Sequence, residues 1–126
     1  MRHLPRKQHS ELLLQANKAV SHIESDKNYS CFFLKNGQKI LMAYSLHVYQ
    51  KALETSFVRI NRSHLINRNE IETIIENRLS TVNGQTFIIS RRRKKHLLAF
   101  LFLFFLHYST VIAQNAIEVN PQGTDA

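Results

Sequence analysis

The sequence predicts a mainly β fold, built as a sandwich or as layered short antiparallel sheets, with a hydrophobic helical segment near its C-terminal end. Three observations support this prediction. Two Asn-Gly pairs, at residues 36–37 and 83–84, lie between apolar segments, which is the pattern of a β-hairpin. Further short apolar runs follow one another at close spacing, with no repeat of fixed period. Residues 97–106, LLAFLFLFFL, form an apolar run unlike the rest of the chain.

The N-terminal part divides into an arm and the start of a folded domain. Residues 1–10 are polar and basic without an apolar period, so we expect a flexible basic arm there. The patterned region that follows predicts one domain over residues 11–96. Within it, Leu12–Leu14 and Ala19–Ile23 are apolar enough to supply the first strands.

The first hairpin is predicted over Tyr29–Ala43. A two-residue type I′ turn at Asn36-Gly37, with positive φ at both residues, would pair Lys35 with Gln38. Counting back along both strands places one set of side chains on the core face. This set comprises Cys31, Phe33, Ile40 and Met42. The single cysteine is thus expected to be a small buried hydrophobe, and it cannot form an intramolecular disulfide.

A short helix is predicted after this hairpin. Ser45 is a favourable N-cap residue. Leu46, Tyr49 and Leu53 would share one face of a helix that ends near Glu54.

The remainder of the domain is predicted as strands. Phe57–Ile60 and Ile71–Ile75 are short apolar runs of strand type. A second hairpin would then pair Leu79–Val82 with Gln85–Ile89 around the second Asn-Gly turn.

Charge gives the first indication of function. There are 17 Lys and Arg against 9 Asp and Glu, a formal net charge of +8, and a pI of about 10.0. Every basic residue lies between Arg2 and Lys95, and the residues after position 95 carry only the acidic Glu118 and Asp125. A folded domain with this excess attracts polyanions, either nucleic acid or an acidic membrane surface.

The sequence lacks the patterns of an enzyme or of a metal site. Its 7 histidines show neither HxxxH nor HExxH spacing, and it has no glycine-rich phosphate loop. Ser63 and His64 are neighbours in sequence, which says nothing about a catalytic pair assembled in space. We therefore expect no catalytic activity, no cofactor and no metal ion.

Two basic segments are candidates for contact with nucleic acid. Residues 57–69, FVRINRSHLINRN, alternate arginines with apolar residues and short polar ones. Arginine can grip guanine through two donors, serine and asparagine can bind phosphate or adenine, and the apolar residues anchor the segment to a core. The second segment is SRRRKK, residues 90–95, which taken alone is more typical of a solvated or membrane-flanking stretch.

These motifs, in this order, resemble the LytTR (LytR/AlgR-type) DNA-binding domain of bacterial response regulators. The resemblance begins at His22-Ile23-Glu24-Ser25 and Asn28-Tyr29-Ser30, is densest over Phe57–Asn67, and ends at Asn83-Gly84 and Ile89-Ser90-Arg91-Arg92. It implies a compact all-β domain of several short sheets with one or two small helices.

The resemblance also implies which residues contact DNA. Members of the family bind tandem DNA repeats by inserting loops, rather than a recognition helix, into the major groove. The corresponding residues here fall in three loops: Asn28 and Tyr29; Asn61, Arg62 and Ser63; and Ser90, Arg91 and Arg92. Asn61 stands where the family usually has a histidine, and an asparagine can still hydrogen-bond a base or a phosphate.

The hydrophobic segment, residues 97–113, is open to three interpretations. It is shorter than the roughly 20 residues of a spanning helix, but it could form a short membrane anchor with the preceding cations on the cytoplasmic side. It could instead be a docking helix or dimer interface, or the start of an exported protein fused to the coding sequence. We expect residues 114–126 to be a disordered tail, and a chain without residues 97–126 to remain a soluble, DNA-binding domain.

The function predicted from the sequence is a sequence-specific transcriptional regulator of LytTR type that binds double-stranded DNA in the cytoplasm. A second copy could bind beside it on a tandem repeat. We expect no receiver domain in this chain, since only about ten residues precede the first predicted strand.

The alternative is a small basic protein at the cytoplasmic face of the membrane, which binds anionic lipid through its cationic cluster and hydrophobic segment. Lipid binding needs only charge, whereas base reading needs Arg62 and Arg91 individually.

Overall fold

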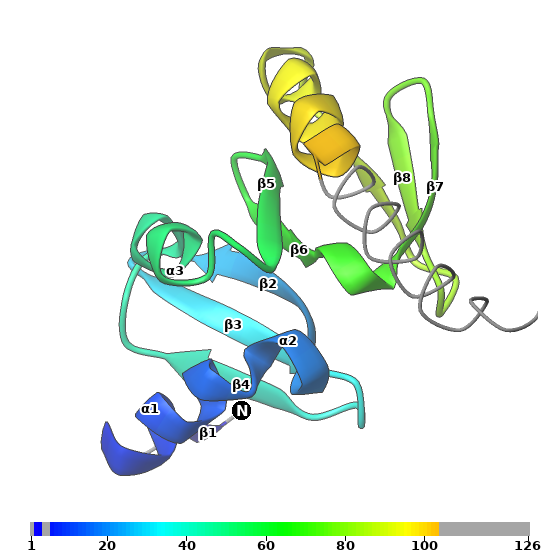
Figure 1. Cartoon of the computed structure of the whole chain (residues 1–126). Helices are drawn as coiled ribbons and strands as arrows, with labels where there is room; N and C mark the ends of the chain where they lie inside the picture. The colour runs from blue at the N-terminus through cyan, green and yellow to red at the C-terminus, as the bar shows by residue number, and fades with distance from the viewer. Residues whose placement is uncertain (1, 4–5, 104–126) are drawn as a thin grey trace, which may run out of the picture.

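A computed structural model describes residues 2–3 and 6–103 of the chain (Figure 1). The strands are β1 (Arg2–His3), β2 (Val20–Asp26), β3 (Tyr29–Leu34), β4 (Lys39–Met42), β5 (Phe57–Asn61), β6 (His64–Asn67), β7 (Ile71–Ile75), β8 (Arg78–Thr81) and β9 (Thr86–Ile88). The helices are α1 (Arg6–Leu14), α2 (Ala16–Ala19), α3 (Leu46–Ala52), the 3₁₀ turn Arg68–Glu70, and a C-terminal helix over residues 91–103. The predicted mainly β class is confirmed, with more helices than the one or two expected.

Within residues 2–3 and 6–103 the strands form two sheets. The larger has the order β1-β4-β3-β2-β6-β5, and the smaller has the order β7-β8-β9. All pairs are antiparallel except β1 with β4, which is parallel. In Figure 1 the helices α1, α2 and α3 lie around the larger sheet, and the smaller sheet and the C-terminal helix (yellow) lie beyond β5 and β6.

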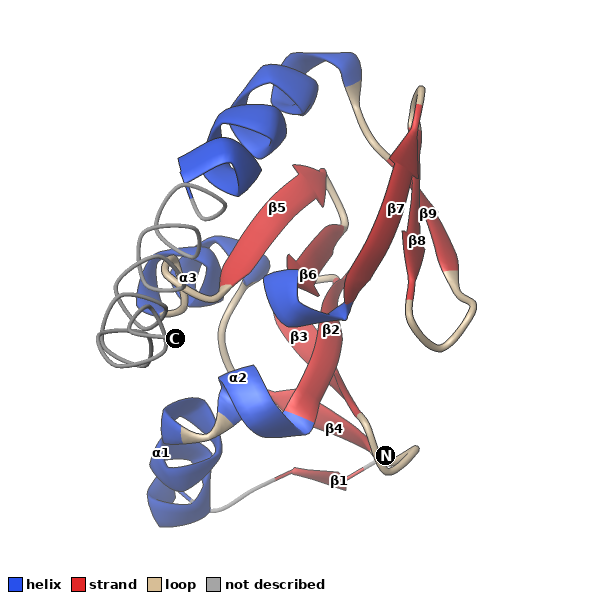
Figure 2. Cartoon of the chain, turned by 45° about the vertical axis from the view of Figure 1, so that its right-hand side comes forward, coloured by secondary structure: helices blue, strands red, loops and turns tan. Residues whose placement is uncertain are grey.

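The described residues form two hydrophobic cores. The first joins the larger sheet to α2 and α3, and its buried residues are Ala16, Val20, Ile23, Phe32, Ile40, Met42, Leu46, Tyr49, Leu53, Phe57 and Leu65. The second joins β5 and β6 to the smaller sheet and the C-terminal helix, and its buried residues are Val58, Ile60, Ile66, Leu79, Phe87, Ile89 and Leu97. Figure 2 shows the C-terminal helix running alongside β5.

Strands β5 and β6 are shared by the two cores. Successive side chains of a strand point to opposite faces of the sheet. Phe57 and Leu65 therefore enter the first core, whereas Val58 and Ile66 enter the second. The hairpin that these strands form is supported by packed side chains on both sides.

The first hairpin has a different register from the predicted one. Leu34, rather than Lys35, is opposite Gln38: its amide donates to the Gln38 carbonyl at 2.9 Å, and Phe32 is paired with Ile40. The loop has three residues, and of these Gly37 is at positive φ (93°), as in a type I turn followed by a left-handed residue. The core face of β3 therefore carries Phe32, while Cys31 and Phe33 point the other way. Cys31 is nevertheless buried, as predicted.

The second Asn-Gly turn repeats this arrangement. The Thr81 amide donates to the Gln85 carbonyl at 2.8 Å, and Gly84 has φ of 86°. β8 accordingly begins and ends one residue earlier than predicted, β9 is shorter than predicted, and the loop is again one residue longer than the expected type I′ turn.

We expect Gly37→Val to destabilise the domain by about 1–2 kcal/mol, because a β-branched residue is strained at positive φ. Among the described residues, apart from the chain neighbours of Gly37, no atom lies within 4 Å of the position that a Cβ would take there, so the expected cost is backbone strain. Gly37→Asn is the matched control, since asparagine tolerates the left-handed region. Urea unfolding of the three proteins measures the effect, and equal stability of the valine and asparagine variants would contradict it.

The N-terminal region is helical where strands or an arm were expected. Within residues 1–10 the structure has β1 and the start of α1, and Leu12–Leu14 end this helix rather than forming a strand. Leu12 and Leu13 follow His9 by about one helical turn, and both leucines pack against the first core. The His9 Nε2 lies 2.7 Å from the Tyr49 hydroxyl of α3, which further fixes α1.

The domain continues past the predicted boundary at residue 96. Leu97 is fully buried in the second core, and Phe100 and Leu101 pack against that core. The first part of the predicted hydrophobic segment therefore belongs to the folded domain. We expect a chain without residues 97–126 to lose part of the second core and to be destabilised, contrary to the prediction from the sequence. The rest of that segment and the tail at 114–126 lie outside the described residues. Within residues 2–3 and 6–103, no helix is long and apolar enough to cross a membrane.

Candidate nucleic-acid interface

The first predicted contact loop is the turn between β2 and β3. Lys27 occupies it with φ of 57°, and Asn28 beside it is exposed. Tyr29 begins β3 and is 46% exposed. Both predicted contact residues are thus accessible from solvent.

The second predicted loop is the turn between β5 and β6, and its three residues differ in role. Arg62 is exposed at its tip. The Asn61 side chain is engaged within the protein: its Nδ2 donates to the Ile88 carbonyl at 2.7 Å, and its Oδ1 accepts from the Ser63 amide at 2.7 Å. The sequence predicted Asn61 as a DNA contact, but the structure gives its amide group a role in shaping the turn.

The Arg59 side chain is hydrogen-bonded to the backbone of the same turn. Its Nε donates to the Asn61 carbonyl at 3.1 Å, and its Nη2 donates to the Arg62 carbonyl. Its Nη1 donates to Gln50 Oε1 on α3 at 3.0 Å. Burial lowers the pKa of Arg59, and the positive charge of Arg93 lowers it further. The role of Arg59 is therefore structural, and its partners are carbonyl and amide oxygens rather than a carboxylate.

The third predicted segment starts the C-terminal helix. Ser90 precedes the helix, and its carbonyl accepts from the amides of Arg93 and Lys94, both at 3.1 Å. The Ser90 hydroxyl is buried and has no hydrogen-bond partner in the described chain. Arg91 and Arg92 are exposed in the first helical turn, where free amides and the helix dipole also favour an anion such as phosphate.

Main-chain hydrogen bonds bring the three segments together at the end of the larger sheet where β2 turns into β3 and β5 into β6, a region called the loop edge. The Ser25 amide, at the end of β2, donates to the Ser63 carbonyl at 2.9 Å. The Ser90 amide donates to the Ile60 carbonyl at 2.9 Å. The turn that carries Arg62 is therefore bonded to the β2–β3 hairpin on one side and to the start of the C-terminal helix on the other.

A histidine supports this edge. His64 Nδ1 lies 3.1 Å from Asn61 Oδ1, and its Nε2 lies 3.2 Å from Glu24 Oε1. Because the Asn61 Nδ2 already donates to a carbonyl, its Oδ1 is the atom that accepts from His64. The sequence did not predict this role, since Glu24 is 40 residues away along the chain.

Asn67 belongs to the same basic segment but is not accessible. It is fully buried, and its Nδ2 donates to the carbonyls of Asn17 (2.9 Å) and Val20 (2.8 Å). It ties the end of β6 to the α2–β2 connection and takes no part in the exposed edge. Among the residues that the structure describes, no group of three His, Cys, Asp or Glu side chains could hold a metal ion.

The comparisons with known proteins agree with this architecture. The family model described as the LytTr DNA-binding domain matches residues 10–102. Among solved structures, the chain is similar to the LytTr DNA-binding domain of a putative methyl-accepting/DNA response regulator from Bacillus cereus. The TM-score is 0.60 at 23% identity, over 68% of this chain and 83% of that one, which shows a shared fold. Among curated proteins, none matches the chain.

Proposed function

Since the chain belongs to the LytTr DNA-binding domain family, we propose that it is a sequence-specific transcriptional regulator that reads the major groove of duplex DNA through the edge described above. The observation that carries the proposal is the joining of three loops by main-chain hydrogen bonds, with Arg62, Arg91 and Arg92 exposed on them. A rigid backbone lets an arginine meet a guanine edge without a large ordering cost.

The exposure of each side chain at this edge indicates whether it reads a base, contacts the DNA beside the bases or positions another residue. Arg62 and Arg91 are the base readers, because each is exposed on a tied backbone segment. Asn28, Tyr29 and Arg92 contact the DNA beside them, and Ser63 supplies the backbone carbonyl that joins the loops. Asn61 and Ser90 act by positioning Arg62 and Arg91 rather than by touching a base.

The target sequence is to be found by selecting bound duplexes from a random pool. We expect an enriched motif, and on tandem sites a second copy bound at a spacing of about one helical turn. A pool that yields no motif under low-salt and moderate-salt conditions would end the regulator proposal, because a charge-only binder enriches nothing.

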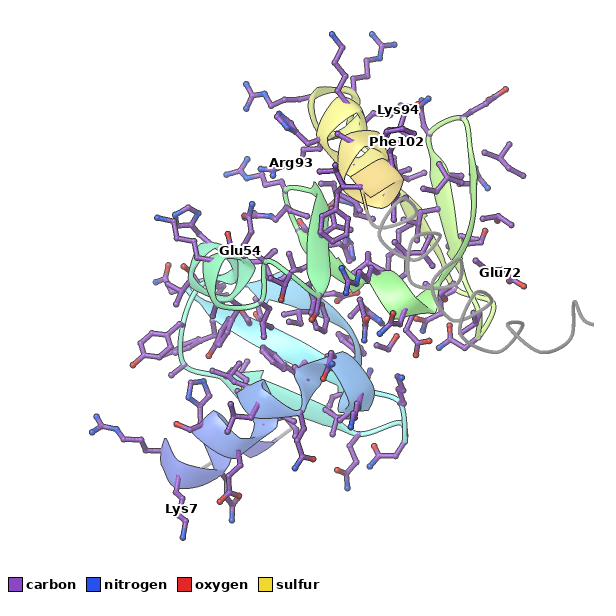
Figure 3. All side chains as sticks on the ribbon, in the orientation of Figure 1. Lys7, Glu54, Glu72, Arg93, Lys94 and Phe102 are labelled. Atoms are coloured by element: carbon purple, nitrogen blue, oxygen red, sulfur yellow. The ribbon has the colours of Figure 1, made fainter. Side chains whose placement is uncertain are left out.

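Arg62→Ala and Arg91→Ala are each expected to weaken binding to the selected duplex by about 1–3 kcal/mol and to broaden the base preference. Lys7→Ala is the control: Lys7 is exposed on α1, at the end of the molecule away from the C-terminal helix (Figure 3). Fluorescence anisotropy at matched salt, with the selected duplex and a scrambled one, measures the effect. If the arginine variants lose affinity for both duplexes equally, these side chains contact phosphate and the base-reading assignment is wrong.

A further inference from the structure

A groove of about 380 Å³ lies between α3, β5 and the C-terminal helix. Its walls carry Gln50 from α3, Glu54 from the turn after α3, Arg59 and its neighbours from β5, and Arg93, His96 and Phe100 from the helix. This volume falls within the roughly 300–1,000 Å³ range of small-molecule pockets. The groove is distinct from the loops assigned to DNA, although Arg59 belongs to both regions.

The charge in this groove is positive and incompletely balanced. Arg59 and Arg93 approach from two different elements, and their mutual repulsion contributes to the lowered pKa of Arg59. Figure 3 shows Arg93 on the side of the C-terminal helix that faces α3 and the turn after it, where Glu54 lies. Within the described part of the chain, the Arg93 side chain makes neither a hydrogen bond nor an ion pair, and Glu54 forms no ion pair with it. An anion would relieve the repulsion between the two guanidinium groups.

The helix side of the groove is apolar. Phe100 lines it with a partly exposed ring, whereas Phe57 and Val58 of β5 also line it but are only 2% and 8% exposed. A hydrated inorganic ion would gain nothing from the Phe100 ring, whereas a flat hydrocarbon ring would bury area against it. The lining therefore suits a molecule with one anionic group and one aromatic body.

We propose that this groove binds a small aromatic carboxylate, with its charge at Arg93 and its ring against Phe100, and that its occupancy changes DNA binding. The second clause rests on the proposed function. Arg59 is the physical link, because the guanidinium that lines the groove also donates to the carbonyls of Asn61 and Arg62. A carboxylate beside it competes for these donors and loosens the turn that presents Arg62.

Binding is tested first without DNA. The full chain is titrated with 2-naphthoate while amide chemical shifts are followed by NMR, with 2-naphthalenemethanol as the uncharged probe of the same shape. We expect saturable shifts at Gln50, Arg93 and Phe100 with naphthoate and much smaller ones with the alcohol. Arg93→Gln should weaken binding about tenfold. Lys95→Gln, on the same helix but outside the groove, should not.

Two results would overturn the site. Equal responses to the two probes would show adsorption to apolar surface alone, and unchanged affinity in a folded Arg93→Gln variant would show that the groove does not hold the charge. Thermal unfolding of the variant establishes that it is folded.

The second measurement is the affinity for the selected duplex at saturating naphthoate. We expect a several-fold loss for the natural chain and none for Arg93→Gln. Unchanged affinity in the natural chain would overturn the coupling. A chain that binds no duplex specifically would refute the proposed function, while the NMR titration would still decide the groove.

Discussion

Leu97→Ala is expected to destabilise the domain by about 3 kcal/mol, within the range of about 2–5 kcal/mol for truncating a buried leucine. Leu97 is 0% exposed and is the residue through which the C-terminal helix enters the second core, beside Val58, Ile60 and Ile66. Its loss leaves a cavity at the base of the segment that carries Arg91. Urea unfolding monitored by far-UV circular dichroism measures the change.

Leu103→Ala is the matched control for this prediction. It removes the same atoms from the same helix, but Leu103 is 66% exposed, so we expect a change of about 0.5 kcal/mol or less. Similar effects of the two substitutions would mean that the helix does not pack on β5 in solution. Deleting residues 97–126 should cost more than Leu97→Ala, since Phe100 and Leu101 are lost as well.

The second large effect is expected on the stability of the domain at acidic pH. His22 is buried between aromatic rings: its ring stacks on Phe33 at 4.3 Å and meets Phe87 edge-on at 5.0 Å. Burial lowers the pKa of His22 from 6.5 to about 4, partly opposed by the nearby Glu24 and assisted by His64. Between these two pH values the unfolded chain binds the proton and the folded chain does not. The stability is therefore complete above pH 6.5 and falls by about 3 kcal/mol as the pH drops to 4.

The free energy of unfolding measured across this pH range tests the prediction. His22→Gln removes the titrating group, so its stability should depend less on pH than that of the natural chain, even if it is lower throughout. His47→Gln, an exposed residue of α3, should leave the slope unchanged. Burial also lowers the pKa of His9, so some acid dependence will remain in the His22 variant. Parallel curves for the natural chain and His22→Gln would contradict the assignment.

The local pattern predicted most of the strands and α3, because these depend on neighbours in sequence. Ser45 and the spacing of Leu46, Tyr49 and Leu53 located the helix, and all three apolar residues are buried. The turns were located but their length was not. An Asn-Gly pair fits a two-residue loop with two positive φ angles and also a three-residue loop with a final left-handed glycine, so the dipeptide does not fix the register.

Other features depended on contacts that no local pattern contains. The run of three leucines at residues 12–14 suggested a strand, but it ends α1, with Leu12 and Leu13 packed on the first core and Leu14 84% exposed. The candidate edge shows the same limit. Its exposed arginines could be predicted from the basic motifs, whereas the role of Asn61 depends on Ile88, which is 27 residues away. The sequence does not show which polar residues of a basic segment are buried. In the structure Asn67 is buried, whereas Arg62 is exposed.

The main-chain bonds that join the three loops have an evolutionary consequence under the proposed function. The Ser25–Ser63 and Ile60–Ser90 bonds use backbone atoms, so they persist whatever side chains the loop tips carry. Mutations at positions 28, 62 and 91 can therefore alter the recognised operator without disturbing the scaffold. Substitutions at Arg59 or Asn61 lack this freedom, because their side chains hold the backbone itself. When the recognised DNA sequence changes during evolution, we expect substitutions at the loop tips, while Arg59 and Asn61 change slowly.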